Sequence, residues 1–394
     1  MPNTILTPTA IARETLAQLI NNCVFGNLVH RDLESNFAKA PRIGESITIR
    51  KPVKFTVTDG ATLSSQDVTE NSTSITIDQR KHVAFSFSSQ ELTMKIDEFS
   101  KRYIEPAAIQ LANAIDSSIA GLYVAVPGFS GAAGTTPNTF AHLANLGKLM
   151  SKNGVPNKGR NLVLGPDAKW TLADAFKGFY QETITKEILR EATLGRFAGF
   201  DCFEDQNIKV HTKGVQSGTP LVNGATQTGS TLVTDGWTIS QTPIIKVGDV
   251  ITIDGVYAVN PVSRETQSHL AQFTVTAAAN SDGSGNATIS IYPAITTSGA
   301  YQTVSGSPAD NAAINVLAAN HVANLAFTKE AFALAMVPLE VPKSAAWSSQ
   351  ESHDGFSIRF IRDYDVTNDK EIYRLDVFYG VKCIYPELAA RLLG

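Results

Sequence analysis

The chain has 394 residues, of which 33 are Lys or Arg and 37 are Asp or Glu, so its formal net charge is -4. With 43% hydrophobic and 18% charged residues, the composition is that of a globular protein and excludes disorder over most of the length. The length exceeds what one hydrophobic core usually spans, which predicts at least two packed units. The near-neutral charge argues against a protein that grips nucleic acid by neutralising phosphates.

Cysteine usage and hydropathy limit the cellular setting. Cys23, Cys202 and Cys383 are far apart and form no C-x-x-C pair, which argues against a disulfide framework or a zinc knuckle and favours reduced cysteines. The chain start lacks a basic head followed by an apolar segment, and no stretch reaches the roughly 18 apolar residues of a membrane span. We therefore expect a protein of cytosol-like solvent with no membrane partner.

Residues 1–44 are predicted to form an N-terminal arm with one amphipathic helix. Thr7 can cap this helix, and Pro8 falls at the first helical position, where proline is tolerated. Apolar residues then recur at helical spacing from Leu16 to Val24, and Gly26 ends the pattern.

Residues 45–88 change to a period of two, which predicts two long antiparallel strands joined by a polar tip. A two-stranded ribbon of about 40 residues is marginal by itself in water, so it needs a partner that the neighbouring sequence does not offer. The alternating apolar residues are Ile47, Ile49, Val53, Phe55 and Val57 in the first strand and Ile75, Ile77, Val83, Phe85 and Phe87 in the second.

Residues 89–211 are predicted to begin with a helix of roughly 35 residues, or about 50 Å. Ser88 and Glu91 form a capping-box pattern at its start, and Pro106 is expected to kink it. A short helix, a buried strand in RNLVLGP and a helix from Pro166 follow, and this order indicates an α+β unit. A glycine-rich, flexible joint is expected around Gly195 and Gly199.

Residues 212–318 have few charges and contain short strands separated by Gly, Asn and Asp turns. This pattern predicts a small β-barrel or sandwich inserted into the first domain. Residues 319–394 return to the α+β pattern and end in a long hairpin, in which VTND forms the turn. The predicted fold class is therefore α+β with an inserted β-barrel.

No catalytic, cofactor or metal site is predicted, so we do not expect an enzyme. The seven histidines stand apart, without an H-E-x-x-H pattern, and are expected on the surface or in packing roles. Ser130 in GFSGAAG lacks the second glycine of a nucleophile elbow, and GVPNKGR lacks the Lys-Ser/Thr of a phosphate loop. The candidate cation ligands are Asp363, Asp365, Asn368 and Asp369, which are ordinary turn formers at a hairpin tip.

The order of these elements resembles the major capsid proteins of tailed bacteriophages. Four segments carry the likeness to coat proteins of short-tailed Salmonella-type phages, namely MSKNGVPNKGRNLVLGP, LGRFAGFDCFEDQNI, VGDVITIDGVYAVNP with GSGNATISIYPAI, and NLAFTKEAFALAMVPLEVP. The resemblance implies the capsid fold named after phage Hong Kong ninety-seven, with residues 1–44 as the N-terminal arm and 45–88 as the extended loop. Residues 89–211 would hold the spine helix with peripheral and axial elements, 212–318 the inserted β-barrel, and 319–394 the return to those domains.

The resemblance also implies a function and partners. The chain would assemble with itself into hexamers and pentamers of an icosahedral shell, with a scaffolding protein and a portal, near packaged double-stranded DNA. Assembly would take place in the bacterial host cytoplasm, and the product would be the virion capsid. The residues expected at contacts between subunits are Ile47, Ile49, Phe55, Asp59, Asp67, Glu70, Ile75 and Ile77, and the expected flexing points are Pro106, Gly195 and Gly199.

Two other classes of function stay open at this point. A cellular nanocompartment shell of the same fold would bind cargo peptides inside and would usually lack the inserted β domain. A binding or adhesion module built on the β domain, or an enzyme with a dispersed site, would tend to lose the long loop of residues 45–88.

Overall fold

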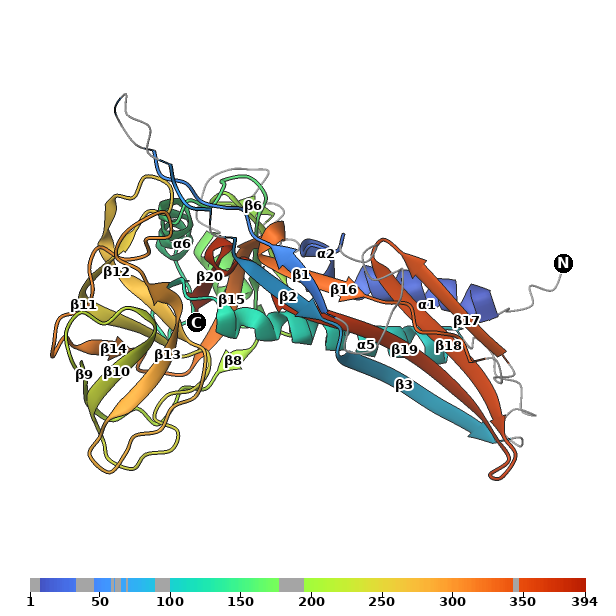
Figure 1. Ribbon diagram of the computed structural model, residues 1–394. Coiled ribbons are helices and arrows are strands. Elements are labelled where there is room, and N and C mark those ends of the chain that lie inside the picture. The colour runs from blue at the N-terminus through green and yellow to red at the C-terminus, as the bar shows by residue number, and fades with distance from the viewer. Residues whose placement is uncertain are drawn as a thin grey trace. The chain divides into compact units, whose positions relative to one another are not determined.

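The computed structural model describes residues 8–32, 46–57, 60, 65–68, 70–88, 100–176, 195–342 and 347–394. The chain divides into two compact units, which are described one at a time (Figure 1). The first unit contains Met1–Arg50, Ser72–Ile119 and Phe332–Ile384, and the second contains Lys51–Asn71, Ala120–Ala331 and Tyr385–Gly394.

The first unit is a twisted antiparallel sheet packed against helices. The main sheet has the order β16-β19-β18-β17, and β3 also pairs with β19, along its first part, whereas β16 pairs with its last part. Helix α1 packs on β17 and β18, and the hydroxyl groups of Ser118 in α5 and Tyr379 in β19 lie 2.9 Å apart. The elements of this unit are α1 (Pro8–Asn22), α2 (Phe25–Leu28), β1 (Ser46–Arg50), β2 (Ser72–Thr76), β3 (Gln79–Ser88), the π-helix η1 (Ser100–Ile104), α5 (Glu105–Ala120), β16 (Phe332–Met336), β17 (Trp347–His353), β18 (Phe356–Asp365) and β19 (Lys370–Cys383).

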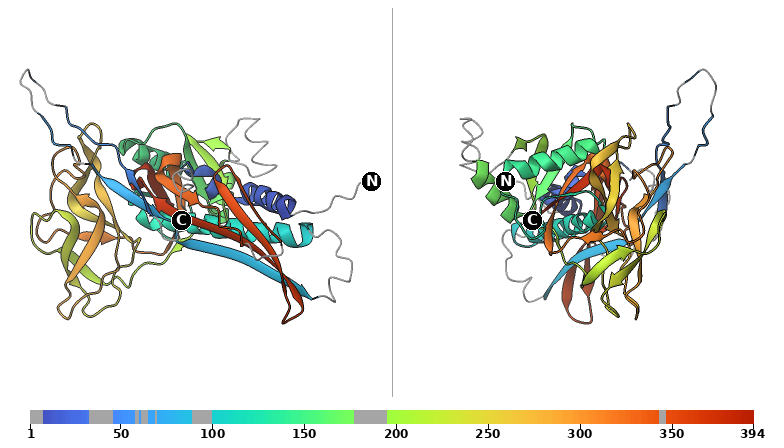
Figure 2. Two further views of the ribbon diagram at one scale, coloured as in Figure 1. Left: turned by 45° about the vertical axis from the view of Figure 1, so that its right-hand side comes forward. Right: turned by 90° about the vertical axis from the view of Figure 1, so that its left-hand side faces the viewer.

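The predicted long hairpin of residues 45–88 is only partly correct. Strands β1 and β2 pair antiparallel over five residues, with Ile47 opposite Ile75. The second half of the predicted ribbon pairs elsewhere, because β3 lies along β19, with Phe85 opposite Tyr373 (Figure 2). The side chains of Phe85 and Tyr373 stack with ring centroids 5.3 Å apart. This part of the ribbon therefore has its partner within the chain, and Phe85 and Tyr373 are 288 residues apart in the sequence.

The predicted long helix is described from Ser100, and residues 89–99 lie outside the described part. The helix changes its hydrogen-bonding pattern along its length, from π-helical η1 to α5 and then to the 3-10 helix η2 (Gly121–Ala125). Pro106 is the second residue of α5, directly after the π-helical turn. A proline near the start of an α-helix removes no hydrogen bond of that helix, so Pro106 does not interrupt α5. The change in helical hydrogen bonding lies before it, in the π-helical turn η1.

The second unit contains a mixed sheet of seven strands and the helices α6 and α7. This sheet and its two helices are called the body. The order is β4-β20-β15-β5-β7-β6, and β8 also pairs with β15. Leucines of α6, α7 and β5 form its apolar core, joined by Phe176 and Phe200. Its elements are β4 (Phe129–Ser130), α6 (Phe140–Lys152), β5 (Arg160–Leu164), α7 (Pro166–Phe176), β6 (Arg196–Phe197), β7 (Phe200–Glu204), β8 (Val210–His211), β15 (His321–Thr328), η3 (Lys329–Ala331), η4 (Pro386–Leu388) and β20 (Ala389–Leu393).

The predicted joint around Gly199 is an ordered β-hairpin in this sheet. Arg196 pairs with Asp201 and Phe197 with Phe200, so Ala198 and Gly199 are the two turn residues. Their φ angles are 50° and 84°, and positive φ at both positions is typical of the tight turn that matches strand twist.

The remaining strands of the second unit form a six-stranded antiparallel sheet, called here the β domain. The order is β14-β11-β12-β13-β10-β9, and the backbone N–H of Val222 in β9 donates to Ala312 next to β14, which brings the two edges together into a near-barrel. Its interior is a separate apolar core that includes Trp237 and Phe273. Its strands are β9 (Gly218–Val222), β10 (Gly229–Trp237), β11 (Val250–Val259), β12 (Thr266–Val275), β13 (Ala287–Ile295) and β14 (Ile314–Val316). The α+β class and the near-barrel agree with the sequence prediction.

Candidate functional site

The segment between β1 and β2 exposes large apolar side chains. Phe55 is 62% exposed, Val57 is 96% exposed and Val68 is 61% exposed. The described residues of this segment contain no helix or strand. Exposed apolar patches mark interaction sites, so these three side chains on one segment make it a candidate contact surface.

Local bonds hold the two arms of this segment together at its base. The backbone N–H of Lys51 donates to the carbonyl of Asn71 over 2.7 Å. Further out, the side chain of Gln66 accepts from the backbone N–H of Thr56 over 2.9 Å and donates back to the carbonyl of the same residue. These bonds link described residues of the two arms without a β-ladder, and the side chains of Phe55, Val57 and Val68 stay exposed.

Two aromatic rings of the same unit contact the first arm. The ammonium of Lys51 lies 5.2 Å from the ring centroid of Tyr385, and that of Lys54 lies 5.9 Å from the ring centroid of Tyr301. Cation–π contacts at exposed sites contribute about 0.5–1 kcal/mol each. They bring the arm beside a loop of the β domain (Figure 2).

The isoleucines predicted as contact residues divide into two groups. Ile75 and Ile77 are buried within the first unit, so their side chains are not available to another subunit. Ile47 and Ile49 are half-buried on one face of β1. The alternating pattern indicated a buried face correctly, but it could not tell a face buried within the chain from one buried between copies.

The other predicted contact residues lie at the surface or outside the described part. Phe55, Asp67 and Glu70 are exposed, and Asp59 lies outside the described residues. Val57 and Val68 were not singled out from the sequence, although Val57 belongs to the alternating pattern. Among the predicted flexing points, Gly195 and Gly199 both have positive φ, of 54° and 84°.

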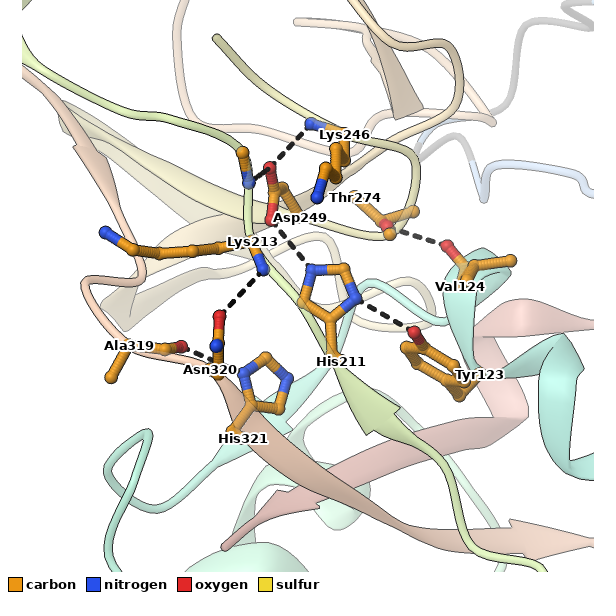
Figure 3. Close-up of polar contacts among 12 residues, drawn as sticks. Tyr123, Val124, His211, Lys213, Lys246, Asp249, Thr274, Ala319, Asn320 and His321 are labelled. Atoms are coloured by element: carbon orange, nitrogen blue, oxygen red, sulfur yellow. Dashed lines mark hydrogen bonds and ion pairs between the residues drawn. The ribbon is translucent and has the colours of Figure 1, made fainter. Parts of the chain in front are cut away.

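A buried polar cluster joins the body to the β domain (Figure 3). The imidazole of His211 in β8 lies between two partners, with its Nδ1 2.9 Å from the hydroxyl of Tyr123 and its Nε2 2.7 Å from a carboxylate oxygen of Asp249. The other carboxylate oxygen of Asp249 accepts the backbone N–H groups of Lys246 and Gly214 over 2.7 and 3.2 Å. All three side chains of the chain Tyr123–His211–Asp249 are buried.

Arg391 lies beside this cluster and is completely buried. Its guanidinium donates to the carbonyls of Val126 and Gly248 over 2.8 and 2.7 Å and to the hydroxyl of Thr274 over 3.0 Å. Burial lowers the pKa of this guanidinium to about 10, so it stays charged at neutral pH. No single sequence motif contains this cluster, because its residues spread over 268 positions and come together only in the fold. The local signal in the sequence was a charged residue, Arg391, within the apolar run ELAARLL.

The motifs set aside in the sequence have structural roles. Arg160 of GVPNKGR is buried and donates to the carbonyls of Pro156, Gly147 and Val155. Asp365 accepts the N–H groups of Thr367 and Asn368 in the turn between β18 and β19. Within the described residues there is no group of three or more His, Cys, Asp and Glu side chains that could hold a metal ion. None of the described helices is long and apolar enough to cross a membrane.

Comparison with known proteins gives one family. The family model described as "P22 coat protein - gene protein 5" matches residues 7–394. None of the curated proteins matches the sequence.

Several solved structures are similar to this chain. That of Mycobacterium phage Che8 has 15% identity and a TM-score of 0.47, and the match covers 94% of this chain and 90% of that chain. The capsid of cyanophage P-SCSP1u has 11% identity and a TM-score of 0.46, with coverage of 89% and 83%. The CUS-3 coat protein I-domain has 23% identity and a TM-score of 0.20, and the match covers 26% of this chain and 97% of that one.

Proposed function

Because this chain belongs to the P22 coat protein family, it is a phage major capsid protein that forms an icosahedral shell, and we propose that copies join through the segment between β1 and β2. The family is one of structural proteins, and the product of self-assembly is the virion capsid. The proposal concerns how the copies contact one another.

The exposed apolar side chains of Phe55, Val57 and Val68 support this proposal. Burying apolar surface is favourable by about 25 cal/mol per Å², so covering such side chains in each copy contributes several kcal/mol per contact. Identical copies that place this segment on a neighbour would repeat the contact around a closed shell. Asp67 and Glu70 then supply a polar rim, and Ile47 and Ile49 offer a half-buried apolar face near the base.

The resemblance to phage coat proteins supports a further proposal about the partners and the place of assembly. We propose that the shell is built from hexamers and pentamers in the host cytoplasm, with a scaffolding protein and a portal. Packaged double-stranded DNA would lie close to the shell without sequence-specific contacts, since the net charge of -4 gives little general attraction to phosphate. The division of the chain into an N-terminal arm, an extended loop, a spine region, an inserted β-barrel and a C-terminal part, with the boundaries given above, stays a prediction.

Replacing Phe55 and Val57 together with serine is expected to leave a folded monomer that assembles poorly. Both side chains are exposed, so their loss costs the monomer little stability, whereas the interface loses two apolar anchors. The concentration needed for shell formation should rise about tenfold or more, which corresponds to about 1.4 kcal/mol per contact. Light scattering and sedimentation of purified protein measure this concentration, and far-UV circular dichroism checks the fold.

Val262→Ser is the matched control, because Val262 is also an exposed valine, 80% exposed, and lies in a turn of the β domain. This variant is expected to assemble as the wild type does. An equal loss of assembly in both variants, or normal shells from the double variant, would show that the segment between β1 and β2 is not the contact surface.

We further propose that Pro106, Gly195 and Gly199 are points where the subunit flexes when the shell expands. Pro106 follows the π-helical turn η1, and Gly199 lies in a turn with positive φ. Pro106→Ala and Gly199→Ala are expected to change the rate of heat-induced shell expansion, followed by electron microscopy. Pro156→Ala, at an exposed turn of the body, is the control. Unchanged expansion in both test variants would exclude the flexing role.

A further inference from the structure

The β domain is attached to the body by polar contacts and not by a shared apolar core. The apolar cores of the two parts contain different residues. Between them, the side-chain amide of Gln272 bonds both the backbone N–H and the carbonyl of Phe129, over 2.9 and 3.0 Å, and Thr274 donates to the carbonyl of Val124 over 2.8 Å. Hydrogen bonds therefore link two parts that have separate apolar cores.

The buried bond between His211 and Asp249 crosses this junction. His211 belongs to the body, where β8 pairs with β15, and Asp249 directly precedes β11 of the β domain. Arg391 crosses the junction as well, since it donates from β20 to Gly248 and Thr274. The cluster thus contains one buried cation, Arg391, and one buried anion, Asp249, which balance each other.

His321 adds a buried titratable group to the cluster. It is 2% exposed, and its Nε2 atom has no hydrogen-bond partner within the described structure. Its ring centroid lies 5.1 Å from that of His211, beside the Tyr123–His211–Asp249 chain (Figure 3). A proton on this imidazole would place a second buried cation near Arg391, with Asp249 as the single nearby anion.

We propose that Tyr123, His211, Asp249, His321 and Arg391 form an acid-sensitive latch, which releases the folded β domain from the body when His321 is protonated. The ionisable groups that face one another here come from five places in the chain: Tyr123 from η2, His211 from β8, Asp249 from the residue before β11, His321 from β15 and Arg391 from β20. Lys213 and Lys246 border the cluster through backbone N–H groups in hydrogen bonds.

The direction of the pH dependence follows from the environment of His321. Burial is the main reason that the pKa of this imidazole is lowered from 6.5 to about 4. The bond to the carbonyl of Ala319 and the charge of Asp249 oppose this shift, whereas His211 and Arg391 add to it. The pKa of this histidine is lower when the β domain is attached than when it is released, so protons favour the released state. Above a pH of about 6.5 neither state binds the proton, and the attached state has its full stability. That stabilisation is lost as the pH falls from 6.5 towards 4 and through it.

The latch is tested on the full-length monomer, kept below the concentration at which it assembles. Small-angle X-ray scattering between pH 7 and pH 3.5 measures the radius of gyration, and circular dichroism measures strand content over the same range. With Trp170 and Trp347 replaced by phenylalanine in every chain tested, fluorescence of Trp237, which is buried in the core of the β domain, reports whether that domain stays folded. The wild type is expected to expand between pH 6.5 and 4 while strand content and Trp237 emission stay unchanged.

Two variants decide the role of His321. His321→Gln, which cannot take up a proton, is expected to stay compact through that pH range, and His321→Asn gives a second neutral side chain if the first variant folds poorly. His82→Gln removes an exposed histidine of β3 and is expected to expand as the wild type does. Expansion of both His321 variants at the wild-type pH would overturn the proposal, as would loss of strand content together with expansion in the wild type.

Discussion

Arg391→Met is expected to lower the free energy of unfolding of the second unit by about 3 kcal/mol. Methionine keeps most of the volume of the side-chain stem, but it leaves two carbonyls and one hydroxyl without the donor that they have in the wild type. Each hydrogen bond to a charged group contributes about 1.5–3 kcal/mol, and relief of the buried charge offsets part of that loss. Urea unfolding at neutral pH, followed by circular dichroism, measures the difference.

Arg391→Lys is the informative companion variant. Lysine keeps the positive charge but cannot reproduce the fork of donors that reaches Val126, Gly248 and Thr274 together, so an intermediate loss is expected. In both variants the β domain should keep its own core, and Trp237 should stay buried after the body has lost stability. A methionine variant within 0.5 kcal/mol of the wild type would contradict the role given to this guanidinium.

Asp116→Ala is expected to lower the free energy of unfolding of the first unit by about 3 kcal/mol. Asp116 in α5 is buried, and its two carboxylate oxygens accept the backbone N–H groups of Val24 and Gly26 over 2.6 and 2.9 Å. Alanine would leave both N–H groups without this acceptor, and each buried unsatisfied group costs about 1–3 kcal/mol. The carboxylate therefore attaches the N-terminal segment, including the buried side chain of Phe25, to helix α5.

Limited trypsin digestion together with urea unfolding measures this effect. Cleavage after Arg31 is expected to be faster in Asp116→Ala than in the wild type, because the N-terminal segment loses its attachment. Gln110→Ala, an exposed position on the same helix, is the control and should change stability by less than about 0.5 kcal/mol. Equal trypsin resistance of Asp116→Ala and Gln110→Ala would show that the carboxylate does not hold the segment.

Several elements were predictable from the sequence because local patterns determine them. The near-barrel strands β11, β12 and β13 coincide with segments of alternating apolar residues between glycine and asparagine turns. The hairpin of β18 and β19 turns at VTND as predicted, and α7 begins at Pro166. In each case the signal lies within about ten residues of the element that it describes.

Strand partners and the buried cluster were not predictable in this way. Phe85 and Phe87 alternate as a strand residue should, but nothing near them indicates that β3 pairs with β19 and not with the preceding strand. Val57 and Val68 are apolar residues whose exposure appears only once the fold is known. His211, Asp249 and Arg391 carry no motif, since their roles depend on burial and on contacts between distant segments.

The two proposals for this subunit rest on two different physical features. Uncovered apolar side chains between β1 and β2 would supply the favourable energy of the proposed contact between copies, whereas the β domain has its own core and is bound to the body through polar contacts. Stable shells and a detachable domain are then compatible, because they depend on different surfaces.

Electron microscopy of the protein expressed alone and together with its genomic neighbours, combined with sedimentation, tests self-assembly most directly. Closed icosahedral particles or polyhead tubes of megadalton mass are the predicted result. A stable monomer under every condition would contradict the conclusion that this chain builds a shell.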